Sequence, residues 1–290
     1  MNPETENKKT LKEKNVKRLL GAALAVGAAG GLVRGIQLLS FDENGLPASA
    51  GGIHVAVWAI LALEIAAAVA VWFVFGKRQI CGRSGRSGLA EYLLPPAAAA
   101  VFALCAAVRL ALSYKPFSAW GIILGIICFA VAASVPVVVK SLGKPSVSEG
   151  EKLISLLPVG AMIAIIIELY RSVAKTPSAS LYAADVFATA VLILLFFSAA
   201  GDVNGKTGPQ KVVAMGFAFV EIGTTAFLGR LIAVGSVLLS GAGISCILTH
   251  EFFEGLMALG GIAFAFAASY AVVRRGERPA EEPAPDEDGN

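Results

Sequence analysis

The stretch FSAWGIILGIICFAVAASVPVVVK, residues 117–140, decides the class of fold, because it carries no charge before its final lysine. A helix rises 1.5 Å per residue, so about 20 residues cross the roughly 30 Å hydrocarbon layer of a bilayer. Strands of a membrane β-barrel would instead alternate in polarity over about ten residues. Seven other stretches share this apolar character. The eight expected spans cover residues 18–41, 53–75, 92–113, 117–140, 153–172, 181–200, 212–231 and 250–273.

The composition of the whole chain agrees with these spans. Of its 290 residues 56% are hydrophobic and 16% charged, and the mean hydropathy is +0.73. Soluble domains carry roughly 25% charged residues, so a soluble enzyme, a disordered chain and a disulfide scaffold are excluded. We therefore expect an all-α, polytopic transmembrane helix bundle in a lipid bilayer. Its expected parts are an N-terminal tail (1–17), a membrane domain (18–273) and a disordered acidic tail (274–290).

The connections between the spans carry a strong charge bias. Eighteen lysines and arginines fall on the side of the N-terminus, and three fall on the opposite side. Because basic residues gather in cytoplasmic connections, this bias predicts an even number of spans with both termini in the cytoplasm. The N-terminal region resembles a signal peptide, but its apolar stretch exceeds twenty residues and contains Arg34, which favours a retained first span.

Residues 231–248 complicate the count, because they are apolar enough to form a ninth span. Nine spans would place Arg274 and Arg275 outside the cell, and the glycines at 235, 241 and 243 disfavour a helix. We expect a continuation of the seventh span, followed by an outer loop or a re-entrant turn.

Small residues recur at four-residue spacing within two of the spans. Gly27, Gly31 and Gly35 lie in the first span, and Gly121 and Gly125 lie in the fourth. Such faces let helix backbones approach closely in lipid. We expect this packing to occur within one chain rather than between two copies.

Charged side chains inside the spans are the strongest functional signal. A charge at the bilayer centre costs at least about 2.5–3.5 kcal/mol, so these groups are expected to pair. Five of them form a candidate outer-leaflet charge network: Arg34, Arg109, Glu168, Asp185 and Arg230. In the alternative interpretation the arginines extend to the interface, and Glu168 pairs with Arg171 three residues later.

Glu64 and Glu221 form a separate group, because both are expected near the midplane of the membrane. Glu221 shares a helix face with Thr224 and Thr225, which together make a short polar stripe. These four residues are the candidate intramembrane polar site. Such carboxyl groups must pair, carry a proton or line a hydrated cavity, so an ion or proton site and a buried structural hydrogen bond are both consistent with the pattern.

Motifs for catalysis and metal binding are weak. HEFFE, residues 250–254, resembles a zinc-binding helix but carries Glu254 in place of the second histidine. A metal site on His54, Cys246, His250 and Glu254 is possible, but carboxylates favoured at a helix start explain Glu254 more simply. We therefore expect no metal and no cofactor.

Signals for an enzyme or a nucleic-acid-binding protein are also lacking. GRSG, residues 82–85, matches a serine-protease string, but it lies in a basic connection and no span holds a histidine to act as base. We therefore expect no catalytic residues and no nucleic-acid partner. The four cysteines form no CxxC pair.

Short motifs at the outer turns carry a family resemblance. FDENGLP, residues 41–47, follows a helix with an arginine; LPV at Leu157, ELYR ending at Arg171 and a helix led by Tyr182 complete the pattern. Together they resemble a family of multi-pass inner-membrane proteins from anaerobic Gram-positive bacteria that has no assigned activity. The resemblance implies a bacterial plasma membrane and transfers no functional residues.

Two functions fit these observations. The first is a permease-like protein for an ion or small solute, with Glu64 and Glu221 at its central site. The second is a non-catalytic membrane scaffold or accessory subunit with a protein partner, in which the same charges hold the helices together. A polar cavity that reaches Glu64 or Glu221 would favour the permease, and a dry, fully paired bundle would favour the scaffold.

Overall fold

The structure is a computed structural model that describes residues 10–11, 13–41, 52–75, 79–80, 89–114, 117–144, 146–174, 181–240 and 250–275. Within these residues, eight helices are long and apolar enough to cross a membrane. They are α2 (Glu13–Leu39), α3 (Gly52–Phe75), α4 (Leu89–Tyr114), α5 (Ala119–Ser141), α6 (Glu149–Val173), α7 (Ala183–Val203), α8 (Pro209–Leu239) and α9 (His250–Arg275). The prediction of an all-α, multi-pass membrane protein with eight spans is confirmed.

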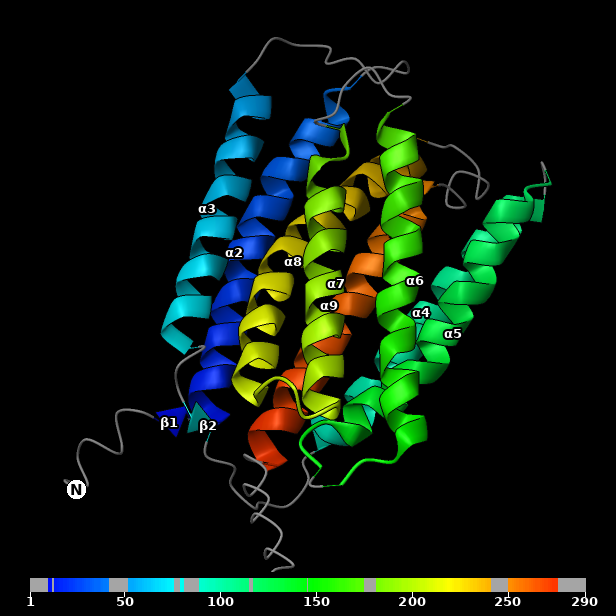
Figure 1. The fold of residues 1–290 in the computed structure, drawn as a ribbon. Helices are drawn as coiled ribbons and strands as arrows, with labels where there is room; N and C mark the ends of the chain where they lie inside the picture. The colour runs from blue at the N-terminus through cyan, green and yellow to red at the C-terminus, as the bar shows by residue number, and fades with distance from the viewer. Residues whose placement is uncertain are drawn as a thin grey trace, which may run out of the picture.

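The helices run alternately in opposite directions (Figure 1). We call the end where α2 begins and α9 ends the proximal end, and the opposite end the distal end. Helix α8 packs against α2, α3, α7 and α9, and the α4–α5 hairpin packs against α9 and α6. Among the described spans α9 is the most buried and α3 the least, so the last helix forms the centre of the bundle.

Local signals set several helix ends. The Ser118 hydroxyl accepts a hydrogen bond from the Gly121 amide at 3.1 Å and caps the start of α5. Pro209 opens α8, where its missing N–H removes no helical bond. Gly143 and Gly205 have φ angles of 66° and 69° after α5 and α7, a left-handed conformation that glycine adopts without steric cost.

Two elements begin or end beyond their expected bounds. Helix α8 extends to Leu239, so the expected continuation of the seventh span is confirmed that far, while the turn expected by residue 248 lies outside the described residues. Helix α2 begins at Glu13 instead of residue 18. Just before it, β1 (Thr10–Leu11) pairs in parallel with β2 (Gln79–Ile80). Strands of two residues are too short to leave a period in the sequence.

The glycine faces lie against neighbouring helices of the same chain, as predicted. A Cβ atom built at Gly27 would lie 2.8 Å from the Cβ of Thr224 in α8, and one at Gly31 would lie 2.6 Å from the Cβ of Leu228. Gly125 of α5 lies in the same way against the side chain of Leu110 in α4. The absence of a side chain at these positions allows the backbones to approach closely.

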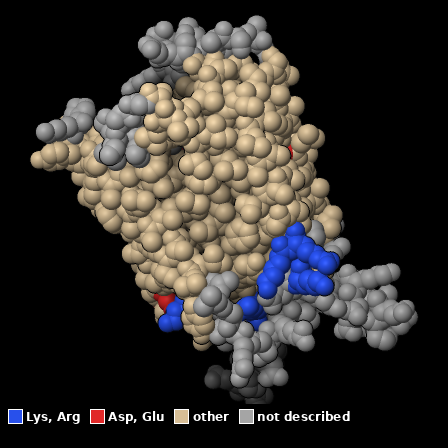
Figure 2. Space-filling model, turned by 180° about the vertical axis from the view of Figure 1, so that it is seen from behind, with Lys and Arg blue, Asp and Glu red and all other residues tan. Residues whose placement is uncertain are grey.

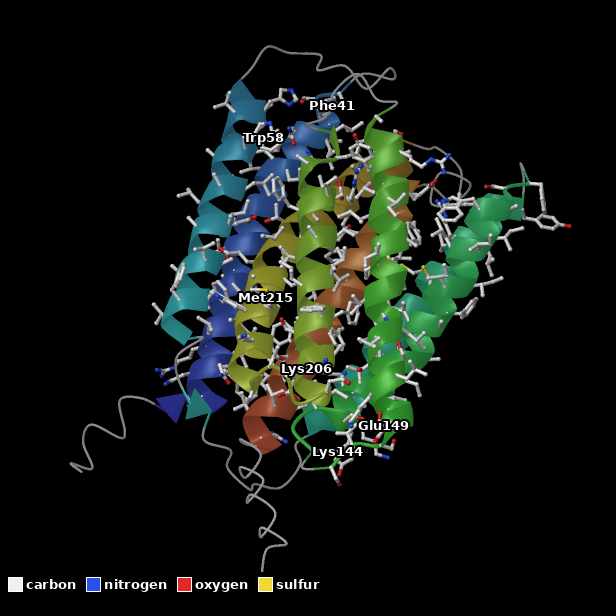
Figure 3. The ribbon with its side chains drawn as sticks, in the orientation of Figure 1. Phe41, Trp58, Lys144, Glu149, Lys206 and Met215 are labelled. Carbon is white, nitrogen blue, oxygen red and sulfur yellow. The ribbon has the colours of Figure 1, made fainter. Side chains whose placement is uncertain are left out.

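The surface of the bundle differs between its flank and its proximal end. The flank seen in Figure 2 carries almost no charge over most of its height, and basic side chains gather at the proximal end. Lys144, Glu149 and Lys206 lie at this end, whereas Phe41 and Trp58 lie at the distal end (Figure 3). The apolar flank is the surface that faces lipid in a multi-pass membrane protein.

Candidate functional site

Glu64 and Glu221 lie at the middle of their helices. Glu64 is twelve residues from the first residue of α3, and Glu221 is equally far from the first residue of α8. At 1.5 Å per residue both lie about 18 Å along their helices. Their exposed fractions are 1% and 2%, so neither carboxyl group has access to solvent.

Of the two neighbouring threonine hydroxyls, only that of Thr225 contacts one of these carboxyl groups. The Thr225 Oγ1 lies 2.5 Å from Glu64 Oε1 and 3.1 Å from the carbonyl oxygen of Gly27, and a hydroxyl has one proton to donate. The Thr224 hydroxyl donates instead to the backbone carbonyl of Val220. Within the described part of the chain, Oε2 of Glu64 and Oε2 of Glu221 are buried and have no hydrogen-bond partner.

Glycine in α2 makes room for this polar group. A Cβ atom built at Gly30 would lie 2.7 Å from Glu64 Oε1, which is closer than real Cβ contacts come. Glu64 and Thr225 therefore meet over a glycine backbone. We call Glu64, Glu221, Thr224 and Thr225 the midplane group.

Four charged side chains from four helices meet near the distal end. They are Arg34 of α2, Asp185 of α7, Arg230 of α8 and Glu254 of α9, which we call the distal cluster. Arg230 lies 2.7 Å (Nη2) and 3.3 Å (Nε) from the two carboxylate oxygens of Asp185, and its Nη2 is 2.8 Å from Glu254 Oε2. Arg34 Nη2 lies 3.5 Å from Asp185 Oδ2. Two positive and two negative charges thus balance.

Neutral groups also accept hydrogen bonds from both arginines. The Leu181 carbonyl oxygen accepts hydrogen bonds from Arg34 and Arg230, and the Gln37 side-chain oxygen accepts from Arg34. Gln37 Nε2 in turn lies 3.0 Å from His54 Nδ1 of α3. The Arg230 guanidinium also lies 5.4 Å from the centre of the Tyr182 ring, within cation–π range.

A second ion pair lies between α4 and α6. Arg109 Nη2 is 3.2 Å from Glu168 Oε1, and the Trp120 indole donates to Glu168 Oε2 at 2.8 Å. Arg171 is 3.7 Å from the same Oε2, so the expected pairing three residues apart is present. The Arg109 guanidinium lies 5.5 Å from the centre of the Phe253 ring of α9. We call Arg109 and Glu168 the Arg109 pair.

The five residues grouped from the sequence therefore meet in two places. Arg34, Asp185 and Arg230 come together, whereas Arg109 and Glu168 bind each other, and a single network of all five stays a prediction. The sequence analysis considered Glu254 for a helix start or a metal site, and it placed neither Glu254 nor Gln37 in the charge network. Two features of the sequence could have indicated these contacts. One is an acidic residue early in an apolar span, as at Asp185, and the other is an amide three residues after Arg34.

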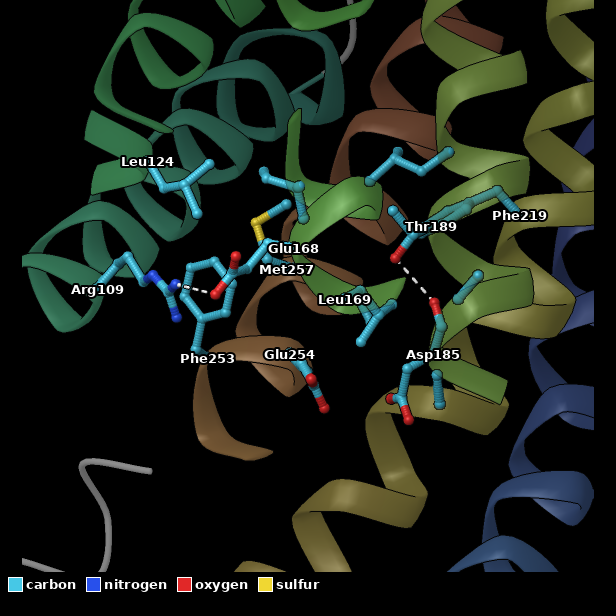
Figure 4. Close-up of a pocket in the computed structure, with 15 residues that line it drawn as sticks. Arg109, Leu124, Glu168, Leu169, Asp185, Thr189, Phe219, Phe253, Glu254 and Met257 are labelled. Atoms are coloured by element: carbon cyan, nitrogen blue, oxygen red, sulfur yellow. Dashed lines mark hydrogen bonds and ion pairs between the residues drawn. The ribbon is translucent and has the colours of Figure 1, made fainter. Parts of the chain in front are cut away.

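A cavity of about 50 Å³ lies between the distal cluster and the Arg109 pair (Figure 4). Its charged lining consists of Arg109, Glu168, Asp185 and Glu254. Its apolar lining includes Leu192, Phe219 and Met257, so it has a charged part and an apolar part. Phe219 lies ten residues into α8, near the depth of Glu221, but neither Glu64 nor Glu221 is among the residues that line the cavity.

Metal-ligating side chains do not gather in the described part of the chain. No group of three His, Cys, Asp or Glu residues there is placed to hold a metal ion. Of the outer metal site considered from the sequence, Cys246 and the side chain of His250 lie outside the described residues.

Comparison with protein-family models, with curated proteins and with solved structures found no match. The structure establishes a multi-pass helical membrane protein. The resemblance to inner-membrane proteins of anaerobic Gram-positive bacteria stays a prediction from the sequence.

Proposed function

We propose that this protein is a permease that moves an ion or a small solute across the membrane, with the midplane group as its central site. The observation that carries the proposal is the pair of buried carboxyl groups near the middle of α3 and α8, each with an oxygen that has no partner among the described residues. An ionised carboxylate there is costly, so each group must bind a proton or a cation or be reached by water. Groups with these alternatives can change state during a transport cycle.

Two other features support transport. Proline residues lie inside α4, α5 and α6, where they remove helical hydrogen bonds. The three helices are continuous, and each missing hydrogen bond leaves a point at which its helix can bend during a transport cycle. The cavity supplies a second polar region within the span, at the distal end.

Replacement of either midplane carboxyl by an amide is expected to abolish transport. In proteoliposomes carrying a pH gradient and an internal pH indicator, Glu64→Gln and Glu221→Gln should reduce solute-dependent proton movement to the level of empty liposomes. The amide keeps the shape of the side chain but cannot release a proton. Candidate solutes are screened first with the wild-type protein.

Glu149→Gln is the matched control, because the Glu149 side chain is 88% exposed at the proximal end. This variant should transport at the wild-type rate. Wild-type transport that persists in both midplane variants would contradict the central role of the midplane group.

The alternative function is a membrane scaffold or accessory subunit. It is favoured by the distal cluster, in which four helices are held by balanced charges, and by the cavity lining, which includes neither Glu64 nor Glu221. Absence of flux for every solute tested, together with co-purification of a stoichiometric protein partner, would favour the scaffold.

We further propose that both termini face the cytoplasm of a bacterial cell, because basic residues gather at the proximal end. In intact cells a membrane-impermeant maleimide should label a Tyr114→Cys variant at the distal end and spare a Lys144→Cys variant. Both positions are described and Tyr114 is 72% exposed. Labelling of the Lys144→Cys variant from outside would reverse the proposed orientation.

The background for this experiment lacks Cys81 and Cys246, while Cys105 and Cys128 are buried and can remain. Native Cys81 and a cysteine near Asn44 are the positions that the sequence itself suggests for labelling. Both lie outside the described residues.

A further inference from the structure

We propose that the cavity between the distal cluster and the Arg109 pair binds a small zwitterion of the amino-acid class. Asp185 and Glu254 would hold its ammonium group, and Arg109 would hold its carboxylate. The proposal goes beyond the proposed function, because it places a solute-binding site outside the midplane group; only the transport of the bound solute rests on that function.

The acidic side of the cavity comes from two helices. Asp185 of α7 and Glu254 of α9 both line it, whereas Arg230, which joins them at 2.7 and 2.8 Å, is not among its lining residues. Both acidic residues therefore belong to the cavity lining, and the arginine that joins them does not. An ammonium group has three donors, and charge-assisted bonds to carboxylates are its strongest contacts.

The basic side of the cavity comes from Arg109. Its guanidinium is positioned over Phe253 and is bound to Glu168. Glu168 is also held by Trp120 and Arg171, so it keeps two partners when Arg109 turns toward a bound carboxylate. A guanidinium binds a carboxylate with two parallel hydrogen bonds, which gives a defined geometry.

The size of the cavity and its apolar lining limit what else the solute can carry besides its two charged groups. A volume of about 50 Å³ restricts the site to the smallest solutes. Leu192, Phe219 and Met257 offer an apolar surface to a short aliphatic side chain. The smallest amino acids, such as alanine, match this combination of two charges and a methyl group.

Other solutes fit less well. A simple organic cation would face Arg109, and a simple anion would face Asp185 and Glu254. A bare metal cation would face Arg109 as well as the apolar surface, and no group of metal ligands is assembled among the described residues. A zwitterion can satisfy both charged sides at once.

The test is equilibrium dialysis of the purified full-length protein in detergent with radiolabelled alanine. We expect saturable binding that unlabelled alanine displaces, whereas ethylamine and propionate at the same concentration do not. Each competitor carries one of the two charged groups. Arg109→Gln and Glu254→Gln should each weaken binding at least about tenfold, because each removes a charge-assisted contact. Lys144→Gln, at the proximal end, should bind alanine like the wild type.

Each outcome decides the proposal. The proposal is overturned if the wild-type protein shows no saturable binding of alanine. It is also overturned if ethylamine or propionate displaces radiolabelled alanine as effectively as unlabelled alanine does. The competition uses the wild-type chain, so the result does not depend on whether a variant folds. Alanine binding without alanine-dependent flux would support this site and contradict the permease. Flux of another solute without alanine binding would support the permease and overturn this site.

Discussion

Asp185→Ala is expected to destabilise the detergent-solubilised protein more than any other single replacement of a charged side chain. The Asp185 carboxylate is 5% exposed and binds both Arg34 and Arg230. Removal of one partner from a buried ion pair costs about 3–5 kcal/mol, against about 0–1 kcal/mol for an exposed pair. The midpoint of thermal unfolding, followed by circular dichroism, should fall accordingly. An unchanged midpoint would contradict a stabilising role of the distal cluster.

A second replacement should restore part of this loss, and the structure identifies which one. Without Asp185, Arg230 keeps the carboxylate of Glu254 at 2.8 Å, whereas the Gln37 and Leu181 oxygens that bind Arg34 are neutral. Arg34→Met in the Asp185→Ala background leaves one positive and one negative charge. We therefore expect Arg34→Met to raise the unfolding midpoint of the Asp185→Ala variant. A larger recovery with Arg230→Met, which leaves Glu254 without its arginine, would contradict this account.

Gly27→Ala is expected to have the second-largest effect on stability, although it adds a single methyl group. The new Cβ atom would overlap the backbone carbonyl oxygen of Glu221 and lie 2.8 Å from the Cβ of Thr224. A backbone atom cannot turn aside, so α2 and α8 must separate. Overpacking of this kind costs about 1–3 kcal/mol, and the loss should appear as a lower unfolding midpoint.

Gly21→Ala is the matched control, because no other atom lies within 4 Å of a Cβ atom built at that position of α2. Alanine favours a helix over glycine by about 1 kcal/mol, so Gly21→Ala should leave stability unchanged or raise it. A Gly27→Ala variant as stable as Gly21→Ala would show that α2 and α8 do not pack as closely as described.

The sequence was sufficient for the number and type of the membrane-spanning helices. Whether a segment such as residues 117–140 crosses a membrane depends on its own length and polarity, because a lipid-embedded helix must satisfy its backbone within itself. The bounds were less accurate: α8 continues to Leu239 because its apolar residues continue past residue 231. The strand pair of Thr10–Leu11 was missed, since two residues carry no periodic signal.

The sequence also determined that buried charges exist in this protein and that they must find partners, because the cost of a charge in lipid is a property of the single side chain. The tertiary structure alone decided which partners these are. Thr225 and Glu64 are 161 positions apart, and Arg34 and Asp185 are 151 positions apart. Their contacts depend on how α2, α3, α7 and α8 are packed and on the direction of each side chain. For the same reason Arg109 binds Glu168, whereas Arg34 and Arg230 bind Asp185.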